Sequence, residues 1–400
     1  MPATAKPVAR SSEAWRQQLG ATGDGRHPRR GSPPPEALPI AERHPSHPTA
    51  LSHRNLQPID RLIVLRDGTL PAAAWNQALN DKAHLMRLWP RGQERPESPD
   101  WDADLRPAQV INIQPDRRGH LGRLARTVLR LQTVLVLGGG GARGLAPIGA
   151  LAAMEEVGLD ETDVVMGVSI GSLVASLLAF GLSSGEILSQ LERVIIRSSP
   201  YNLTLPRDAL FTLANPRREM ELFFGPTRLQ DCWLRLHCFS TNLSRNRLQA
   251  WCLGSIPTAV ITSMSMPGSF PPVEDSRGDL HVDGGILNNL PIAAARGLSD
   301  GRVIAVSLDV DPDTADQDSP DRKRRRSSIA RTIISAMMCT SHSQSRAQEN
   351  LADLVLKPEI GAYPLLGWKS YREIVLADQG HARSRLGDGT RFRRAATPRS

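Results

Sequence analysis

The sequence predicts an α/β protein built on a mostly parallel β-sheet with helices on both faces. From residue 133 onward, short apolar runs of strand type alternate with segments of helical period. Glycines and prolines mark the boundaries between them. Because parallel strands are joined by helical crossovers, this alternation indicates a sheet that is covered on both sides.

The predicted strands are apolar runs that end at turn residues. They are TVLVLG (133–138), VVMGVS (164–169), WLRLHCFST (233–241), LHVD (280–283) and VIAVSLDV (303–310). The predicted helices lie at 145–158, 172–180, 291–297 and 327–338. Pro147 and Pro291 fit the first turn of their helices, where no N–H group is needed. Residues 351–382 return to strand and helix patterns.

Outside this region the sequence is polar and irregular. Residues 1–60 are rich in Pro, Arg, Ser and His without a hydrophobic period, which predicts a disordered tail. Residues 61–130 form a predicted linker, whose segment 120–131 has apolar and basic residues at helical spacing. This amphipathic helix either packs on the neighbouring domain or faces lipid. Residues 386–400 form a basic tail, and the basic run 322–326 is either a solvated loop or a nuclear-targeting or phosphate-binding segment.

Composition narrows the class of protein. The chain has 49 basic and 41 acidic residues, a formal net charge of +8. This charge suits an anionic surface such as phospholipid, but charge alone does not distinguish lipid from nucleic acid. The four cysteines lack metal-ligand spacing and disulfide density, which predicts reduced thiols, a cytoplasmic setting and no metal site. The N-terminal residues contain no apolar signal-peptide core, so secretion is not expected.

One uncharged stretch, 164–185, is long enough by itself to span a membrane. Gly167, Ser169 and Gly171 interrupt it near its start. We therefore expect a short buried strand, a tight turn and a core helix there, not a membrane-spanning helix.

The strongest local signal is GVSIGS (167–172), where an apolar strand runs directly into an apolar helix. A strand-turn-helix arrangement around G-x-S-x-G exposes the central serine, here Ser169, above the sheet. Gly167 and Gly171 avoid Cβ clashes in such a turn, and the helix N-terminus that follows favours negative charge. The pattern predicts a nucleophile; the alternative is a turn of small residues needed only for close packing.

A second glycine-rich turn, GGGGARG (138–144), also lies between a predicted strand and a predicted helix. Gly139, Gly141 and Gly144 fit G-x-G-x-x-G, which is typical of dinucleotide-binding sites. The same turn lets backbone N–H groups converge on the oxyanion of a tetrahedral intermediate. No Lys-Ser or Lys-Thr pair follows, which excludes a nucleotide-triphosphate loop.

A third signal, HVDGGILNNLPI (281–292), decides between these interpretations. It places Asp283 at the end of a short strand, before Gly284 and Gly285, where the chain can turn sharply. A serine hydroxyl needs a base that takes its proton, and a carboxylate at the same edge of the sheet meets that need. An unperturbed aspartate has a pKa of about 3.9, so we expect burial to raise its basicity.

In this order the three motifs resemble those of the patatin-like phospholipase family. The stretch RLARTVLRLQTVLVLGGGGARGLAPIGAL is most similar to the neuropathy target esterase branch, and CFSTNLS (238–244) and SMSMPGSFPPV (263–273) also resemble the family's pattern. The resemblance covers residues 131–385, with the motifs in 135–296, and implies a patatin-like three-layer hydrolase domain.

The resemblance also implies roles for individual residues. Ser169 would be the nucleophile and Asp283 the base of a dyad without histidine. The implied oxyanion hole is formed by residues of the first glycine turn: Gly139, Gly140, Gly141, Arg143 and Gly144. The implied motif glycines are Gly167, Gly171, Gly284 and Gly285. No metal or organic cofactor is implied.

Four further side chains have two interpretations each. His342 and His381 follow Asp283 in the chain order of an ordinary catalytic triad, and His281 precedes it by two residues, on the same strand face. We predict packing or surface roles for these histidines. Arg143 either neutralises a substrate phosphate or anchors the glycine loop.

Together these observations predict a serine lipid acyl hydrolase that cleaves fatty-acyl esters through an acyl-enzyme on Ser169. By resemblance, the substrate is phospholipid or lysophospholipid, the partner is a peripheral membrane surface and no nucleic acid is bound. The expected location is the cytoplasm or the membrane periphery. Two alternatives stay open: a dinucleotide-binding α/β protein that uses the glycine loop, and a catalytically silent lipid-binding scaffold.

Overall fold

The computed structural model describes residues 62–66, 83–94, 96, 109–117, 119–159, 161–193, 211, 214–309, 329–364 and 367–387. The predicted N-terminal tail and the basic run 322–326 lie outside these residues, as does the basic tail beyond residue 387.

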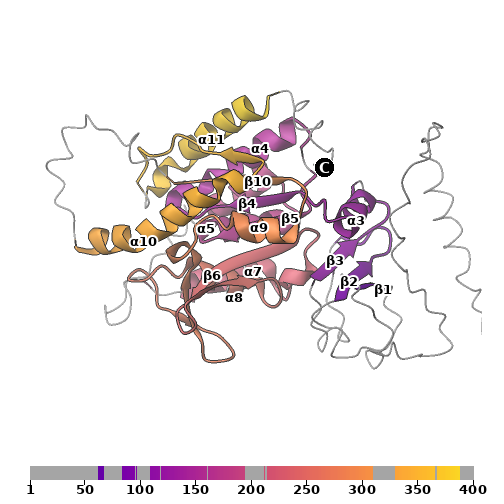
Figure 1. The fold of residues 1–400 in the computed structure, drawn as a ribbon, viewed down its shortest axis with the longest axis horizontal. Helices are drawn as coiled ribbons and strands as arrows, with labels where there is room; N and C mark the ends of the chain where they lie inside the picture. Colours follow the sequence, from indigo (N-terminus) through magenta and orange to yellow (C-terminus); the bar gives the residue numbers. More distant parts are fainter. Residues whose placement is uncertain are drawn as a thin grey trace, which may run out of the picture. The chain divides into compact units, whose positions relative to one another are not determined.

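An eight-stranded sheet forms the centre of the fold, in the order β11-β10-β4-β5-β6-β9-β8, with β7 also paired to β6 (Figure 1). Its strands are β4 (Val134–Leu137), β5 (Val164–Val168), β6 (Arg235–Asn242), β7 (Arg247–Trp251), β8 (Val273–Glu274), β9 (Leu280–Asp283), β10 (Val303–Val306) and β11 (Leu354–Leu356). The pairs from β11 to β6 are parallel. β7 and β9 run antiparallel to β6, and β8 runs antiparallel to β9. The predicted α/β class with a mostly parallel sheet is confirmed.

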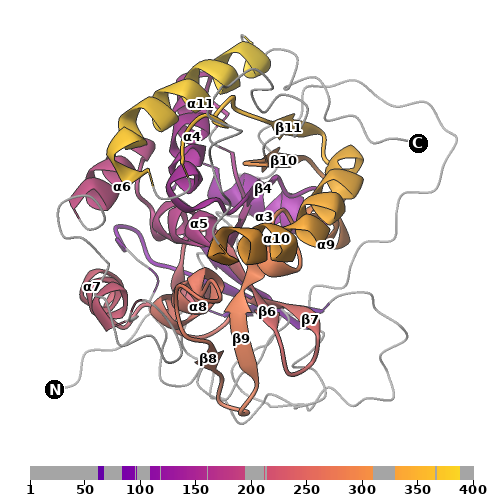
Figure 2. The same cartoon turned by 90° about the vertical axis from the view of Figure 1, so that its left-hand side faces the viewer.

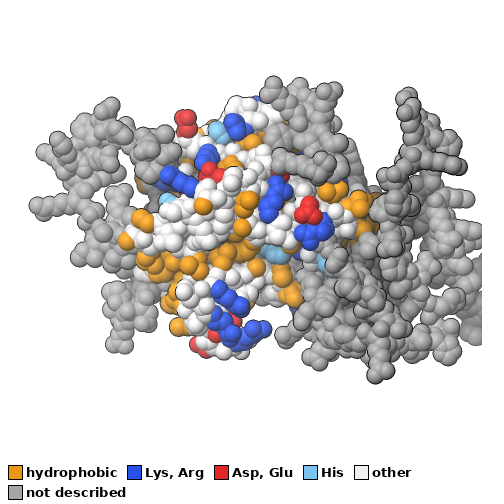
Figure 3. Space-filling model, viewed as in Figure 1, with side chains coloured by type: hydrophobic (Ala, Val, Ile, Leu, Met, Phe, Trp, Pro, Cys, Tyr) orange, Lys and Arg blue, Asp and Glu red, His pale blue; other side chains and the backbone are white. Residues whose placement is uncertain are grey.

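Two apolar cores lie on opposite faces of this sheet. Leu135 and Leu137 of β4 pack into one core, and Val134 and Val136 pack into the other. The helices that pack into the first core are α4 (Pro147–Glu156), α5 (Ile170–Phe180), α6 (Ser184–Leu191), α7 (Ala214–Phe224), α8 (Ile256–Met264) and α11 (Tyr371–Leu386). The second core includes α9 (Ile292–Leu298), and α10 (Ile329–Gln348) contacts α9 (Figure 2). The result is a three-layer arrangement of helices, sheet and helices, with side chains of all types on its surface (Figure 3).

The uncharged stretch 164–185 contains two elements instead of one. β5 and α5 are separated by the turn at Ser169, and α5 ends after 11 residues at Gly181, whose φ of 109° lies in the left-handed region. In the part of the chain that the structure describes, no helix is both long and apolar enough to cross a bilayer. The predicted strand, turn and core helix are confirmed.

A second, smaller sheet precedes the main one. Its parallel strands β1 (Leu62–Arg66), β2 (Ala83–Leu88) and β3 (Gln109–Ile113) lie within the region predicted as a linker. A buried ion pair joins this sheet to the larger domain, since Arg87 Nη1 lies 2.8 Å from Asp231 Oδ1. Asn112 Nδ2 donates to the carbonyl oxygens of Gln230 and Cys232 at 2.9 and 2.8 Å. The small sheet therefore packs directly on the segment that leads into β6.

The basic amphipathic segment forms α3 (His120–Val128), which also packs on the larger domain. Arg126 binds both carboxylate oxygens of Asp163 at 2.8 Å, and Arg123 Nη1 donates to the carbonyl oxygen of Trp233 at 2.7 Å. Asp163 is buried just before β5 and accepts the backbone N–H of Thr133 as well. The arginines of α3 are therefore used for packing, which favours the first of the two interpretations of this helix.

Candidate active site

Strand register places the end of β5 beside the end of β9. Val168, the last residue of β5, pairs with Phe239 of β6, and Asp283, the last residue of β9, pairs with Ser240. β7 pairs with 238–242 and so overlaps both contacts, which puts it on the opposite edge of β6. β5 and β9 therefore meet end to end along one edge of β6.

Ser169 lies at this junction, in a turn with a strained backbone. Its φ of 53° and ψ of −131° are unusual for a residue with a side chain and cost about 1–3 kcal/mol. Two other serines hold the turn: Ser263 Oγ accepts the Ser169 N–H at 2.9 Å, and Ser172 Oγ donates to the Ser169 carbonyl at 2.6 Å. The Ser169 side chain thus stands between a strand end and a helix start, with its residue only half-buried.

The glycines of this turn are required for close packing. A Cβ at Gly171 would lie 2.5 Å from the carbonyl oxygen of Gly138 and 2.6 Å from that of Leu137. A Cβ at Gly167 would lie 2.5 Å from the Ser172 Cα. α5 therefore approaches the end of β4 at backbone contact, so these glycines serve close packing whether or not Ser169 is a nucleophile.

We expect Gly171→Ala to lower the free energy of unfolding by about 3 kcal/mol, because the added methyl meets rigid backbone oxygens. Urea denaturation measures the loss. Gly185→Ala on the surface of α6 is the matched control, since a Cβ at this position would have nothing within 4 Å. There alanine should be neutral or stabilising by up to about 1 kcal/mol. Equal effects at the two positions would contradict the packing argument.

The Asp283 carboxylate accepts a hydrogen bond from the Ser169 hydroxyl. Ser169 Oγ donates to Asp283 Oδ2 at 2.6 Å, and the backbone N–H of Gly285 donates to Oδ1 at 2.8 Å. The Asp283 N–H in turn donates to the carbonyl of Ser265, so the end of α8 holds both partners. Burial raises the pKa of Asp283 from 3.8 to about 6, against the opposing hydrogen bonds from Ser169 and Gly285. The carboxylate is thus a stronger base than an exposed aspartate.

The glycine loop lies directly against Ser169. A Cβ at Gly139 would lie 2.7 Å from the Ser169 Cβ. Asn289 binds the Gly139 residue on both sides: its Oδ1 accepts the Gly139 N–H at 3.1 Å and its Nδ2 donates to the Gly139 carbonyl at 2.9 Å. Within the described residues, no acceptor meets the backbone N–H of Gly140 or Gly141. These two N–H groups are therefore free to serve as donors.

Contacts of the other three residues expected at the oxyanion hole favour Gly140 and Gly141 as the donors. The N–H of Gly139 is occupied by Asn289, and the N–H of Arg143 donates to the Gly140 carbonyl at 3.1 Å. Gly144 serves packing, because a Cβ there would lie 1.5 Å from Ile170 Cγ2. The contacts of Asn289 with Gly139 and of Ile170 with Gly144 join residues that are far apart in the sequence. The motif alone therefore does not tell which of its residues donate and which serve packing.

The first glycine of the DGG motif also serves close packing. A Cβ at Gly284 would lie 2.4 Å from the carbonyl oxygen of Phe239 on β6. The chain after Asp283 therefore runs at backbone contact with β6, and this contact fixes where the carboxylate lies.

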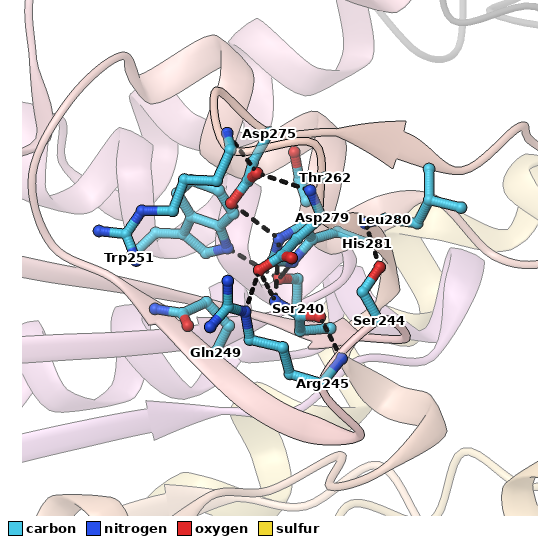
Figure 4. A network of polar contacts seen from close by, with 12 residues as sticks. Ser240, Ser244, Arg245, Gln249, Trp251, Thr262, Asp275, Asp279, Leu280 and His281 are labelled. Carbon is cyan, nitrogen blue, oxygen red and sulfur yellow. Dashed lines mark hydrogen bonds and ion pairs between the residues drawn. The ribbon is translucent and has the colours of Figure 1, made fainter.

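His281 belongs to a separate buried network (Figure 4). Its Nδ1 lies 3.0 Å from Ser240 Oγ, its Nε2 lies 3.4 Å from Asp275 Oδ2, and its ring contacts the Trp251 ring edge-on at 5.1 Å. This Ser-His-Asp chain is not a second catalytic triad, because Ser240 has no exposed surface and its Oγ already accepts the Trp251 Nε1–H at 2.8 Å. The network joins β6, β7 and the β8–β9 hairpin.

The other two histidines also bond elsewhere. His342 Nε2 lies 3.6 Å from Asp309 Oδ1, and His381 Nε2 accepts the Lys357 backbone N–H at 3.1 Å. None of the contacts found for the three histidines in the described chain includes Ser169 or Asp283. Within those same ranges, no group of three or more His, Cys, Asp or Glu side chains could hold a metal ion.

The dinucleotide interpretation meets a structural obstacle at α4. A pyrophosphate would need free N–H groups at the N-terminus of the helix that follows the glycine loop. Here Pro147 has no N–H, and the buried carboxyl of Asp378 accepts the Ala150 N–H at 3.0 Å. The Gly139 N–H is occupied as well. The chain's own polar groups therefore occupy two of the N–H groups that a dinucleotide could use, those of Gly139 and Ala150.

Three residues of the site were not predicted from the sequence. Ser263, Asn289 and Asp378 bind the nucleophile turn, the glycine loop and the start of α4, respectively. Asn289 follows the DGG motif closely, so its place near that turn could have been predicted. Its partner Gly139 is 150 residues away, and that pairing has no local signal.

Fold and site together define a class: an α/β domain that holds a partly exposed serine against a buried aspartate at the carboxyl end of its central strands. Residues 135–296 match the family model described as patatin-like phospholipase. The chain therefore carries a patatin-like phospholipase domain, and the family resemblance inferred from the three motifs is confirmed.

Curated relatives align with about half of the chain. The chain is 32% identical over 209 residues to lysophospholipase nte1 of Aspergillus niger, which covers 51% of this chain and 14% of that protein. It is 34% identical over 206 residues to patatin-like phospholipase domain-containing protein 6 of Mus musculus, covering 50% and 15%. The chain thus spans only a small part of the length of these relatives. Among solved structures, VipD from Legionella pneumophila matches with 16% identity and a TM-score of 0.37, over 64% of this chain and 66% of that one.

Proposed function

We propose that this domain is a serine lipid acyl hydrolase of the phospholipase or lysophospholipase type, with Ser169 as nucleophile and Asp283 as base. The observation that carries the proposal is the 2.6 Å hydrogen bond from Ser169 Oγ to the buried Asp283 carboxylate, beside a loop with two unoccupied N–H groups. Nucleophile, base and oxyanion donors are the three parts that acyl transfer needs.

The reaction would proceed in two balanced halves. Asp283 Oδ2 takes the hydroxyl proton while Ser169 Oγ bonds to the acyl carbon, and the carbonyl oxygen becomes an oxyanion facing Gly140 and Gly141 N–H. Collapse of this intermediate breaks the ester bond, and the leaving alcohol takes the proton from Asp283. Water then attacks the acyl-enzyme with the same base, which releases the fatty acid and restores Ser169.

The helix that follows Ser169 adds to oxyanion stabilisation. α5 begins at Ile170, immediately after the nucleophile, so the positive end of its dipole lies at the site. The buried carboxylate needs no histidine to reach a useful basicity, since its pKa of about 6 is close to neutral pH.

The proposed substrate class is inferred from the relatives of this chain. The Aspergillus niger relative is a lysophospholipase by name, and the mouse relative is named as a protein with a patatin-like phospholipase domain. A long-chain ester reaches such a site from a micelle or membrane, so peripheral binding to lipid is part of the proposal. The net charge of +8 is compatible with an anionic lipid surface.

A direct assay tests this function. The purified chain is incubated with lysophosphatidylcholine and, separately, with p-nitrophenyl butyrate, and release of fatty acid or nitrophenol is followed. We expect turnover of both esters and covalent labelling by a fluorophosphonate probe. A chain that binds lipid vesicles but neither turns over an ester nor reacts with the probe would instead be the silent scaffold.

A further inference from the structure

The C-terminal segment, described at residues 354–364 and 367–386, lies beyond the part of the chain that matches the family model, yet it contacts the glycine loop. We infer that two contacts with this segment hold the oxyanion loop: Arg143, which binds the carbonyls of Gly361 and Tyr363, and Asp378, which binds the start of α4, are positioning residues. The inference rests on the proposed function, because it assigns a task to the Gly140 and Gly141 N–H groups.

Arg143 is the first tether. Its Nε donates to the carbonyl of Tyr363 at 2.6 Å, and its Nη2 donates to the carbonyl of Gly361 at 2.9 Å. The backbone N–H of the same residue donates to the Gly140 carbonyl. Arg143 is therefore hydrogen-bonded directly to the peptide group that carries the Gly141 N–H.

These contacts decide between the two interpretations of Arg143. A phosphate ligand needs guanidinium N–H groups that point at the ligand, commonly in pairs. Here Nε and Nη2 are occupied by two backbone carbonyls, and burial lowers the pKa of the guanidinium. The geometry therefore favours an anchor of the loop, and the anchor is made to carbonyls instead of an acidic side chain.

Asp378 is the second tether, at the other end of the loop. Its side chain is fully buried on α11, and Oδ2 accepts the Ala150 N–H in the first turn of α4. The two helices touch there, since a Cβ at Gly149 would lie 2.1 Å from the Val375 carbonyl oxygen. Figure 2 shows α4 and α11 side by side. α11 thus fixes where α4 begins, and with it where the loop ends.

The two tethers and Asn289 fix the glycine loop at three points along its length. Asn289 fixes Gly139 at its start, Arg143 fixes its middle and Asp378 fixes the helix that follows. Oxyanion donors act only when they lie at hydrogen-bonding distance, about 2.7–3.1 Å, from the developing charge, and a misplacement of about 1 Å can cost about 100-fold in rate. Loss of a tether should therefore lower kcat more than it weakens binding.

The test compares Arg143→Met with the wild type on two esters, p-nitrophenyl butyrate, which has no phosphate, and lysophosphatidylcholine, which has one. A loop anchor predicts that kcat falls about 10- to 100-fold on both esters, with little change in KM. A loss confined to lysophosphatidylcholine and expressed in KM would show that Arg143 binds phosphate. Unchanged kcat on both esters would also overturn the inference.

Arg383→Met is the matched control. Arg383 joins α11 to the far end of α4 through Glu156 and is largely exposed, so its loss should leave kcat unchanged. For the second tether, Asp378→Asn keeps an oxygen for the Ala150 N–H, whereas Asp378→Leu does not. We expect the leucine variant to lose more kcat than the asparagine variant; equal kcat in both would remove Asp378 from the proposal.

A measurement that does not depend on ester hydrolysis tests this inference independently of the proposed function. Hydrogen exchange of the amides in 139–146 should quicken in Arg143→Met but not in Arg383→Met, because only the first variant releases the loop. If the wild type hydrolyses no ester, the proposed function fails, and the exchange data still decide whether the C-terminal segment holds the loop. Equal protection in both variants would refute the tether.

Discussion

Ser169→Ala is expected to lower kcat for both esters by at least about 1,000-fold, because the hydroxyl that forms the acyl-enzyme is removed. The residual rate would come from binding and from the Gly140 and Gly141 N–H groups acting on attack by water. Initial rates of nitrophenol and fatty-acid release measure the loss. Fluorophosphonate labelling should disappear in the same variant, since the probe bonds to the nucleophile.

The matched control is Ser176→Ala, because Ser176 lies on α5, the helix that follows Ser169. Ser176 Oγ is buried and donates to the Ser172 carbonyl, one turn away from the nucleophile. Its loss should leave labelling and kcat near wild type. Labelling that persists in Ser169→Ala but disappears in another serine variant would assign the nucleophile elsewhere.

Stability separates catalytic loss from misfolding. Alanine at 169 keeps the strained φ of 53°, so the free energy of unfolding should change by less than about 1 kcal/mol. Glycine at the same position relieves that strain and should stabilise the protein while remaining inactive. Such a pair of inactive but folded variants would show that the strain at Ser169 serves the reaction and not the fold.

Much of the fold follows from local patterns. Buried strands such as β4 and β5 are uninterrupted apolar runs, and the helices after them carry proline or glycine at their ends. The strands β2 and β3 were not predicted, because the sequence around them has no clear period. No local pattern indicates that Arg87 of β2 pairs with Asp231 in the larger domain.

In the candidate site too, the local sequence predicts some features and not others. Ser169 and Asp283 were predicted because each lies at a strand end beside glycines. The meeting of β5 and β9 along one edge of β6 depends on register, which the local sequence does not encode. The donors of the glycine loop could not be separated from its packing glycines, since Asn289 and Ile170 decide that question across space.

Asp283→Asn is expected to reduce kcat by about 1,000-fold or more, because the amide cannot accept the Ser169 proton. In the wild type, kcat/KM should rise with pH through the Asp283 pKa of about 6, since only the ionised form is a base. The variant should lose this acid limb. Asp279→Asn, at the tip of the same hairpin and bonded to Arg245, is the control that should keep both rate and pH profile.

The same substitution should make the protein more stable at alkaline pH. Because burial raises the Asp283 pKa from 3.8 to about 6, the unfolded chain ionises first as pH rises. As the pH rises from about 4 to about 6, the free energy of unfolding therefore falls by about 3 kcal/mol in total. Above this range the contribution of Asp283 no longer changes with pH. Asparagine carries no such cost, so its advantage over the wild type should grow by about 1–2 kcal/mol from pH 5 to pH 8.

Urea denaturation of both proteins at these two pH values measures the difference. The buried Asp378, whose pKa burial raises to about 7, is present in both proteins and cancels in the comparison. A constant difference between the two proteins at pH 5 and pH 8 would mean that Asp283 titrates as an ordinary exposed aspartate. In that case the carboxylate would be too weak a base at neutral pH to act on Ser169 without a further partner.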